Sequence, residues 1–371
     1  MRILVLPKYD RLGASSRMRM YQFFPALVQA GFQIECAPLF DEGYLHALQR
    51  QRRSWFRVLV ALLRRIAVLL KVRRYDLVWI EKECLPWVPY ELERFFLRRS
   101  KAYVLDYDDA VFHLYDEHRM AWVRTLLGNK HPQLVQRAAA VIVGNAYLMQ
   151  FALEAKAKAA GAKNSARSAS HATILRLVPS VIDLNHYGDS IRPFDPSPSR
   201  GPAQVVWIGQ RSTLKYLKPL RPLMLRLVGE GLCEFICIGA DPSTFDLPMQ
   251  HRLWHEASEV DELKRCDIGI MPLEDGAFER GKCGYKLIQY MASGLPVVAS
   301  PVGANCHIVI ENETGYFAQT LEQWEAALRA LCQAAAKRRE MGAAGQARAA
   351  KRFSLQALAG DVVQTLQRAA F

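Results

Sequence analysis

A loop rich in glycine and lysine, followed by an amphipathic helix, carries the clearest chemical signal in the chain. Residues 279–303 read ERGKCGYKLIQYMASGLPVVASPVG. Unpaired backbone N–H groups and the positive end of the helix dipole make such a helix start a binding site for anions. Gly281 and Gly284 would let the backbone approach a phosphate. Lys282 and Lys286 would supply positive charge, so these residues predict a site for a diphosphate.

The same helix offers a polar group for a second part of the ligand. Gln289 follows Lys286 by three residues, so the two side chains share one face of the helix. Cys283 and Tyr285 complete the loop around the helix start. Together these residues suit a nucleotide diphosphate whose ribose hydroxyls are held beside the phosphates.

The run KLIQYMASGLPVVASPVG, residues 286–303, resembles the donor-binding signature of glycosyltransferase family 4, in a bacterial polysaccharide-type branch. Members of that family are retaining enzymes that use nucleotide sugars and have two Rossmann-like domains, the GT-B architecture. The family pattern has two glutamates with seven residues between them, and the second grips the ribose. Gln289 stands at the second position and Gly281 at the first. Three acids upstream are open candidates for the missing carboxylate: Glu274, Asp275 and Glu279.

The resemblance also gives a role to residues 11–19, RLGASSRMR. A glycine loop at this place in the family faces the donor phosphates and the acceptor, which implies a close backbone approach at Gly13. Serine can cap the following helix and arginine can bind phosphate. The residues expected on the acceptor side are Ser15, Ser16, Arg17 and Arg19. Two arginines two positions apart point to different faces of a helix, so at most one is the expected contact. The alternative is an ordinary capped helix with solvated arginines.

Residues 106–112, DYDDAVF, resemble a segment of the same bacterial branch and follow a predicted buried strand. Three adjacent acids repel one another unless they have partners. We expect Asp108 and Asp109 to contact hydroxyl groups of the sugar or the acceptor. The alternative is that one acid caps a helix and another pairs with Arg17 or Arg19. A metal site is a third and less favoured alternative.

Residues 209–217, GQRSTLKYL, follow another predicted strand, where the family usually has an arginine and a lysine for the diphosphate. Arg211 and Lys215 would take these roles together with Lys286. The base of the nucleotide would lie near Trp254, which is equally compatible with a place in the core. Further donor-binding residues expected at these strand ends are Gly209, Ser212, Thr213 and Gly239. A capped helix start on the surface is the alternative for this segment.

Short apolar strands that alternate with helices must position these loops. The alternation predicts an α/β fold with parallel sheets covered on both faces, and the resemblance implies the GT-B form of it. Strands are expected at residues 1–6, 32–38, 76–80, 102–105, 140–143, 205–208, 235–238, 268–271 and 297–299. Helices are expected at residues 21–30, 321–341 and 355–369.

A chain of 371 residues is too long for one ordinary core. The sequence predicts two domains, at residues 1–190 and 191–354, and the resemblance implies that the first binds the acceptor and the second the nucleotide sugar. A C-terminal helix at 355–371 is expected to cross back to the first domain. A proline-rich linker is expected at residues 192–202.

The net charge of +13 and the pI of about 9.4 point to a polyanionic partner. Residues 50–74 hold nine lysines or arginines and no acid, at helical spacing with apolar residues. This segment is either a helix with a solvated basic face or a helix on an anionic membrane surface. Nucleic acid is the least favoured partner, because no nucleic-acid-binding motif accompanies the charge. The eight scattered cysteines and the absence of a signal-peptide pattern predict a reduced, cytoplasmic protein.

The resemblance therefore implies a retaining glycosyltransferase that needs neither a cofactor nor a metal. It would transfer a sugar from a UDP- or GDP-sugar to a hydroxyl acceptor, with a lipid-diphosphate-linked glycan at the inner face of the plasma membrane as the expected acceptor. The setting would be bacterial surface polysaccharide synthesis. The residues expected to carry the chemistry are Asp108, Asp109, Arg211 and Lys286. The alternatives are a non-catalytic protein that binds sugar nucleotides and a nucleotide-sugar epimerase.

Overall fold

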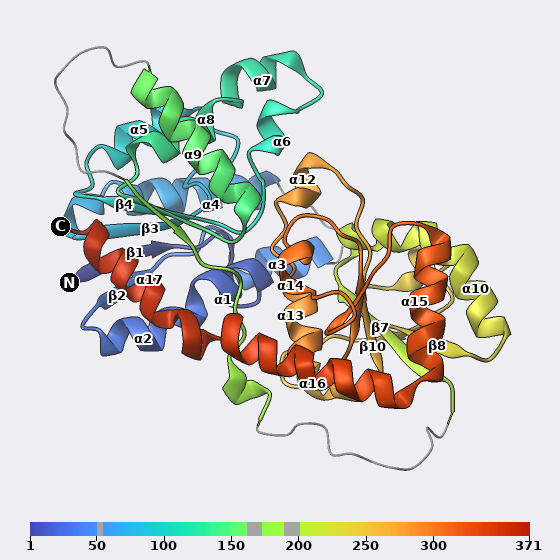
Figure 1. Ribbon diagram of the computed structural model, residues 1–371. Helices are drawn as coiled ribbons and strands as arrows, with labels where there is room; N and C mark the ends of the chain where they lie inside the picture. The colour runs from blue at the N-terminus through green and yellow to red at the C-terminus, as the bar shows by residue number, and fades with distance from the viewer. Residues whose placement is uncertain (50–54, 162–172, 189–200) are drawn as a thin grey trace. The chain divides into compact units, whose positions relative to one another are not determined.

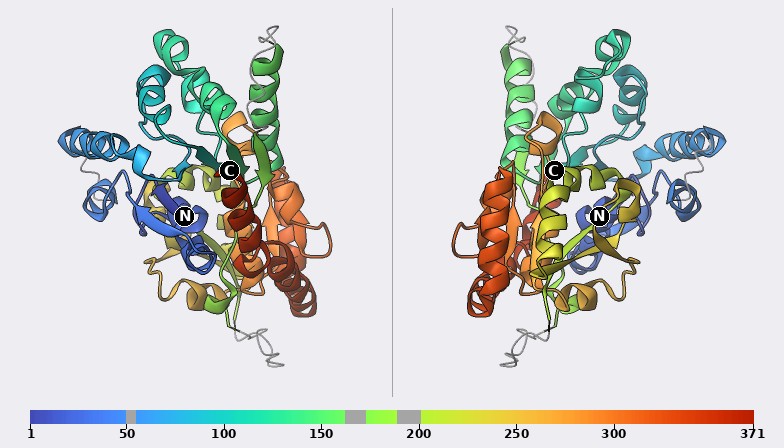
Figure 2. Two further views of the ribbon diagram at one scale, coloured as in Figure 1. Left: turned by 90° about the vertical axis from the view of Figure 1, so that its left-hand side faces the viewer. Right: turned by 90° about the vertical axis from the view of Figure 1, so that its right-hand side faces the viewer.

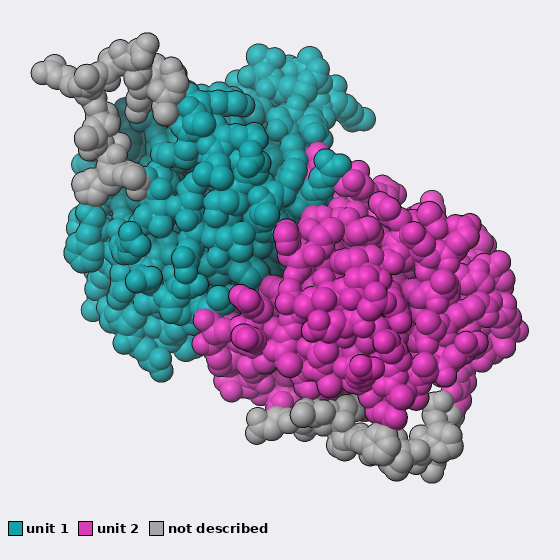
Figure 3. All heavy atoms as spheres, viewed as in Figure 1, with its two compact units in different colours: residues 1–180, 280–283, 358–371 teal, residues 181–279, 284–357 magenta. Residues whose placement is uncertain are grey.

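The computed structural model describes residues 1–49, 55–161, 173–188 and 201–371 (Figures 1 and 2). The chain divides into two compact units (Figure 3). Unit 1 comprises residues 1–180, 280–283 and 358–371, and unit 2 comprises residues 181–279 and 284–357. The predicted linker lies outside the described residues, except for Gly201 and Pro202.

Unit 1 is built on six parallel strands in the order β2-β1-β3-β4-β5-β6. The four inner strands are apolar and buried almost throughout, as expected for a parallel sheet with helices on both faces. The edge strands β2 and β6 are partly exposed. The strands are β1 (Arg2–Leu6), β2 (Gln33–Cys36), β3 (Leu77–Glu81), β4 (Tyr103–Tyr107), β5 (Ala140–Val143) and β6 (Ile174–Leu177).

Helices cover both faces of this sheet. Figure 1 shows α5, α8 and α9 on one face and α2 and α17 on the other. Leu4, Leu6 and Val78 face the core that contains α5, α8 and α9. The helices of this unit are α1 (Ala14–Arg19), α2 (Phe24–Gln29), α3 (Glu42–Gln49), α4 (Trp55–Leu69), α5 (Tyr90–Leu97), α6 (His113–Asp116), α7 (Ala121–Leu127), α8 (Lys130–Arg137), α9 (Ala146–Gly161) and most of α17 (Leu355–Ala369).

Unit 2 repeats the plan with six parallel strands in the order β12-β11-β10-β7-β8-β9. The strands are β7 (Ala203–Gly209), β8 (Cys233–Gly239), β9 (Met249–Arg252), β10 (Ile268–Met271), β11 (Val297–Ala299) and β12 (Gly315–Phe317). The helices are α10 (Arg221–Gly229), α11 (Glu259–Lys264), α12 (Ala277–Arg280), α13 (Tyr285–Ala292), α14 (Asn305–Ile308), α15 (Leu321–Gln333) and α16 (Ala335–Arg352).

The predicted α/β fold with two parallel sheets is confirmed, with two corrections of detail. The helix expected at residues 321–341 is two helices, because the backbone leaves the helical region at Ala334 (φ −119°, ψ 83°). A capping box between Thr320 and Gln323 begins the first of them. The edge strands β6, β9 and β12 were not predicted. Within the described ranges, no helix has both the length and the apolar character needed to cross a membrane.

Both sheets reverse their strand order at a central strand, and ligands of open α/β sheets bind at such points. In unit 1, β1 lies between β2 and β3, and in unit 2, β7 lies between β8 and β10. The loops after β1, β3 and β7 contain or adjoin most of the polar residues considered below. The topology therefore supplies one candidate ligand edge in each unit.

The segment Arg280–Cys283 of the predicted phosphate loop belongs to unit 1. Asn145, at the start of α9, holds it there. The Asn145 side-chain amide donates hydrogen bonds to the carbonyl oxygens of Gly281 and Lys282 at 2.9 and 3.0 Å. A buried amide that satisfies consecutive carbonyls fixes the path of this segment.

Close packing fixes the same segment. A Cβ atom added at Gly144 would lie 2.1 Å from the Cys283 sulfur, and one added at Gly281 would lie 2.4 Å from the Cβ of Ala110. Real Cβ atoms do not approach that closely, so both glycines are needed for the segment to reach its place.

We predict that Gly144→Ala destabilises the protein by about 1–3 kcal/mol, because the new methyl group overlaps the Cys283 sulfur. Cys283→Ala in the same chain removes that sulfur and leaves the added Cβ with contacts no shorter than 3.4 Å. The double variant should therefore recover most of the loss. Thermal unfolding of wild type, both single variants and the double variant measures the coupling. Simple addition of the two single effects would contradict the packing described here.

Candidate functional site

The ligand edge of unit 1 is organised around a buried lysine. Lys82 follows β3 with a left-handed backbone (φ 65°), and its side chain is almost wholly buried. The Lys82 ammonium lies 2.7 Å from Asp108 Oδ1 and donates to Ser15 Oγ at 3.1 Å. Glu81 Oε1 and Asp109 Oδ2 lie 3.6 and 3.9 Å from the same nitrogen. A single cation is thus shared among three carboxylates.

Two serines of α1 connect this cluster to the loop after β1. Ser15 Oγ lies 2.7 Å from Glu81 Oε1 and 2.5 Å from Asp108 Oδ2. Ser16 Oγ donates to Glu81 Oε2 at 2.5 Å and accepts the N–H of Tyr9 at 3.0 Å. The expected helix-capping role of these serines is wrong, since α1 has no side-chain cap. Their hydroxyls instead satisfy buried carboxylates.

The two predicted aspartates differ in their affinity for protons. Burial alone would raise the pKa of Asp108, but the charge of Lys82 and hydrogen bonds from Lys82 and Ser15 lower it below its ordinary value. Burial and the negative charge of Asp108 raise the pKa of Asp109, against the opposing charges of Lys82 and Lys282. Such a divergence between neighbouring carboxyl groups is typical of functional sites.

Asp109 is the member of this pair that a ligand can reach. Its side chain is 31% exposed, whereas that of Asp108 is 11% exposed. Lys282 Nζ approaches Asp109 Oδ1 at 4.0 Å. A partly exposed carboxyl with a raised pKa can accept a hydrogen bond or a proton from a hydroxyl group.

The arginines expected on the acceptor side are directed inward. Arg19 Nε lies 2.7 Å from Asp106 Oδ1, and Arg19 also donates to the carbonyl of Val178 at 2.7 Å. Both partners of the ion pair are 1% exposed, so Arg19 offers no surface to an acceptor. The alternative in which one acid of this loop pairs with Arg19 is correct for Asp106. Arg17 is also buried and donates to the carbonyl of Arg11.

The ligand edge of unit 2 is organised by two glycines and a lysine. The Lys286 ammonium lies 4.5 Å from the centre of the buried Trp207 ring. A Cβ added at Gly209 would come within 3.0 Å of the same ammonium. Gly239 has a positive φ of 101°, and a Cβ there would lie 2.7 Å from the carbonyl oxygen of Gly209. The glycines let the carboxyl ends of β7 and β8 pack closely against each other and against Trp207, beside a cation.

The helix that carries Lys286 begins at a left-handed glycine. Gly284 (φ 63°) is the N-cap of α13, and no side chain caps the helix. Tyr285 is the first residue of α13, and Cys283 packs into the core of unit 1. The backbone N–H groups of the first turn therefore have the anion-binding character that the sequence predicts.

Gln289 is paired with a carboxylate that sequence reasoning missed. Its amide nitrogen lies 2.5 Å from Glu259 Oε1, at the start of α11. The indole N–H of Trp254 also donates to Glu259. Gln289 is buried, and Glu259 is partly exposed. The pair places the carboxylate of Glu259, a charged hydrogen-bond acceptor, beside Gln289, which stands where the family pattern has a glutamate.

The segment after β7 is arranged differently from the expectation. Lys215 Nζ lies 3.7 Å from Glu279 Oε1, and Tyr216 donates to the same oxygen at 2.5 Å. Thr213 donates to the carbonyl of Gln210. Arg211 and Ser212 are exposed. Hydrogen bonds from Ser243 lower the pKa of the Asp241 carboxyl, and the positive charge of Arg211 lowers it further. Lys215 and Glu279 are thus directed at each other.

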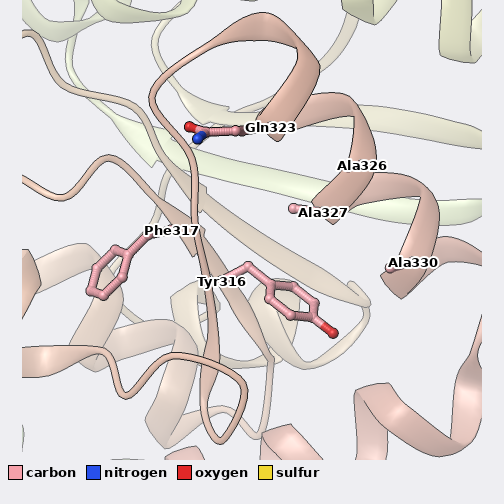
Figure 4. Close-up of a pocket in the computed structure, with 6 residues that line it drawn as sticks. All are labelled: Tyr316, Phe317, Gln323, Ala326, Ala327 and Ala330. Carbon is pink, nitrogen blue, oxygen red and sulfur yellow. The ribbon is translucent and has the colours of Figure 1, made fainter.

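Two other features of the described residues lie apart from these clusters. A pocket of ≈ 300 Å³ opens between β12 and α15 (Figure 4). None of the predicted site residues lines it; the lining is Tyr316, Phe317, Gln323, Ala326, Ala327 and Ala330. His113, Asp116 and Glu117 lie close enough to share a cation. Both ring nitrogens of His113 already have protein partners, Asp116 at 2.9 Å and Tyr147 at 2.8 Å, so we assign no ion there.

The structure therefore assembles the predicted residues in two groups. In unit 1, Ser15, Ser16, Asp108, Asp109 and Lys282 gather with Glu81 and Lys82. In unit 2, Gly209, Gly239 and Lys286 gather, with Gln289 joined to Glu259. Gly13 begins α1 and packs against Tyr9, where an added Cβ would lie 2.3 Å from the Tyr9 Cβ. A role for Lys82 could have been predicted from the sequence, because charged residues directly follow the strand expected at 76–80.

Comparisons with known proteins bear on the fold and on the class of protein. Residues 214–334 match the family model described as glycosyl transferases group 1. No curated protein matches the chain in sequence. Sucrose-phosphate synthase from Thermosynechococcus elongatus has a similar structure, with a TM-score of 0.69 and 17% identity, over 99% of this chain and 98% of that chain.

Two further solved structures have the same fold. HepE from Anabaena, in complex with UDP and glucose, matches with a TM-score of 0.65 and 15% identity over 99% of both chains. A UDP-forming α,α-trehalose-phosphate synthase from Burkholderia xenovorans matches with a TM-score of 0.65 and 13% identity, over 100% of this chain and 99% of that chain. These likenesses show the GT-B fold. The group 1 domain at residues 214–334, together with this fold, confirms the prediction of a glycosyltransferase.

Proposed function

We propose that the protein is a retaining glycosyltransferase that uses a UDP-sugar. The observation that carries this proposal is the position of Lys286, which lies within the matched residues 214–334, beside Gly209 at the strand reversal of unit 2. UDP is favoured over GDP because similar structures contain UDP or UDP-glucose. Family 4 within group 1, and its polysaccharide branch, are part of this proposal.

Cations and backbone donors hold the diphosphate in this proposal. Lys286 and the first turn of α13 bind its oxygens, and Arg211 adds charge from the end of β7. Negative charge develops on the diphosphate as the sugar departs, and preorganised donors stabilise that charge. No metal or other cofactor is needed for this role. Glu259 and Gln289 together hold the ribose hydroxyls, since a carboxylate accepts stronger hydrogen bonds than an amide.

The acceptor enters on the side of Asp109. A hydroxyl of the acceptor next to the attacking one donates a hydrogen bond to this carboxyl, which orients the acceptor. The bond from the acceptor oxygen to the anomeric carbon forms as the bond from that carbon to the diphosphate breaks. The acceptor oxygen attacks from the face that the diphosphate leaves and passes its proton to the departing phosphate oxygen, so the configuration at the anomeric carbon is retained. Asp108 stays ionised beside Lys82 and holds the loop.

A second part of the proposal concerns the membrane. Helix α4 turns Ala61, Arg65 and Leu69 inward and leaves a stripe of large apolar side chains exposed. The exposed side chains are Trp55, Phe56, Leu59 and Leu63, with Leu70 just after the helix. Residues 50–54 of the basic segment lie outside the described residues.

Basic residues border this stripe. Arg57, Arg64 and Lys71 are exposed at intervals of seven residues, each beside an exposed apolar side chain. Arg65 does not contribute, since it is buried and donates to the carbonyls of Pro7 and Ala37. An apolar stripe edged by cations suits a helix lying on an anionic membrane. We therefore propose a peripheral protein of the inner membrane face and a lipid-diphosphate-linked glycan as acceptor.

UDP should stabilise the purified protein against heat in the presence of EDTA. A ligand that binds only the folded state at 100 times its Kd adds about 2.7 kcal/mol. Lys286→Ala should abolish the shift, because it removes the cation at the diphosphate. Lys351→Ala, an exposed lysine at the end of α16, is the matched control and should keep it. Absence of a shift with UDP, GDP, ADP and CMP alike would contradict the proposal, as would an equal shift in Lys286→Ala.

Vesicles that contain phosphatidylglycerol should bind the protein more tightly than vesicles of phosphatidylcholine alone. We expect Leu59→Ser/Leu63→Ser to weaken binding by about tenfold or more, because two exposed apolar contacts are lost. Leu225→Ser/Val228→Ser removes two exposed apolar side chains of α10 and serves as the control. Sedimentation with vesicles measures both. Equal binding by the two double variants would contradict a membrane role for α4.

A further inference from the structure

The loop after β3 contains a second strained residue, which the proposed chemistry does not use. Lys82 (φ 65°) and Trp87 (φ 63°) both adopt the left-handed region. For a bulky side chain this conformation costs on the order of 1–3 kcal/mol and persists only where the surroundings enforce it. The strain at Lys82 places an ammonium among carboxylates. The strain at Trp87 therefore calls for its own explanation.

Three contacts hold Trp87. Its backbone N–H donates to the Tyr115 hydroxyl at 3.0 Å. Its ring meets the Tyr115 ring edge-on at 5.1 Å and the His118 ring at 5.7 Å. The Tyr115 hydroxyl in turn donates its only proton to Glu83 Oε1 at 2.8 Å. Tyr115 is therefore locked as an acceptor for the Trp87 N–H.

A buried ion network stands behind Tyr115. Lys130 lies 2.6 Å from Glu83 and 2.9 Å from Glu93, and it donates to the carbonyl of Leu85 at 2.6 Å. Glu93 accepts the N–H of Cys84 at 2.6 Å. Glu83, Cys84 and Leu85, between Lys82 and Trp87, are thus all tied to this network. Buried ion pairs add little stability compared with an apolar core, so we connect this one with the conformation it imposes.

These contacts hold the indole ring of Trp87 in an exposed position. Trp87 is 54% exposed, although tryptophan is usually largely buried. The loop leaves β3 between the ends of β1 and β4, and Trp87 follows Lys82 by five positions. The carboxylates of Asp116 and Glu117 are exposed on the same short segment as Tyr115 and His118. An apolar ring face therefore stands near carboxylates on the acceptor unit.

This combination matches the chemistry of a saccharide. The faces of a pyranose ring carry C–H groups that pack on an aromatic ring, and its rim carries hydroxyls that donate to carboxylates. We propose that Trp87 is the stacking platform for a sugar ring of the acceptor. The inference rests on the proposed transferase function and names a carbohydrate part in the acceptor. Tyr115 is the positioning residue for this platform.

The test uses the full chain with 5-fluorotryptophan in place of its seven tryptophans. The Trp87 resonance is assigned by its loss in Trp87→Phe. Methyl glycosides of glucose, galactose, mannose, N-acetylglucosamine and rhamnose are the probes. At least one should shift the Trp87 resonance saturably, while Trp122, exposed on α7, stays unchanged. Failure of all five probes, or an equal response of Trp122, overturns the proposal. A response to hexanol equal to that of the glycosides also overturns it, in favour of a lipid contact.

Saturation-transfer NMR measures binding of the glycoside that shifts the Trp87 resonance. It distinguishes a stacking role of Trp87 from a general effect of the residue on the folded structure. Trp87→Ser should weaken glycoside binding by about threefold to tenfold, and Trp87→Phe should weaken it less, because an aromatic face remains. The UDP-induced thermal shift should be the same in both variants and in wild type. Loss of that shift in the Trp87 variants would mean that they are not correctly folded. Glycoside binding is then measured in Tyr115→Phe, which keeps the ring but removes the hydroxyl that accepts the Trp87 N–H, and this measurement decides the proposal. Unchanged glycoside binding in Trp87→Ser overturns the proposal whether or not the protein binds UDP.

Discussion

One buried ammonium, that of Lys82, makes the ligand edge of unit 1 possible. Glu81, Asp108 and Asp109 all lie within 4 Å of it. Without a cation, carboxylates gathered at the end of a buried strand could not all remain ionised. Lys82 takes a left-handed backbone to reach this place, and Ser15 bridges two of its partners. The cluster joins the loops after β1, β3 and β4, so the geometry of the whole edge depends on it.

The two units meet the needs of binding in different ways. At the strand edge of unit 1, Lys82 pairs with several carboxylates. Among these carboxylates, Asp109 is partly exposed and has a raised pKa. Unit 2 packs the ends of β7 and β8 closely together through Gly209 and Gly239 and places the cation of Lys286 beside them. A densely bonded edge suits the orientation of a neutral hydroxyl group. A strand edge with a lysine and a helix start suits a diphosphate.

The sequence predicted the inner strands and the ligand loops because their signals are local. Apolar runs such as those of β3 and β8 are buried on both faces, whereas β6, β9 and β12 are partly exposed edge strands without such a run. Partners are not local, which is why the roles of several side chains could not be predicted. Arg19 has the right type for a phosphate contact but lies buried against Asp106. Glu259 could not be connected with Gln289, thirty residues away, before the fold brought them together.

An NMR titration of the Asp109 carboxyl, in wild type and in Asp108→Asn, tests the central claim most directly. The ordinary pKa of an aspartate is about 3.9. The account predicts a higher value for Asp109 in wild type and a fall in Asp108→Asn, because the neighbouring negative charge is removed and Lys82 is left to pair with Asp109. A wild-type pKa at or below the ordinary value, unchanged by Asp108→Asn, would contradict the account.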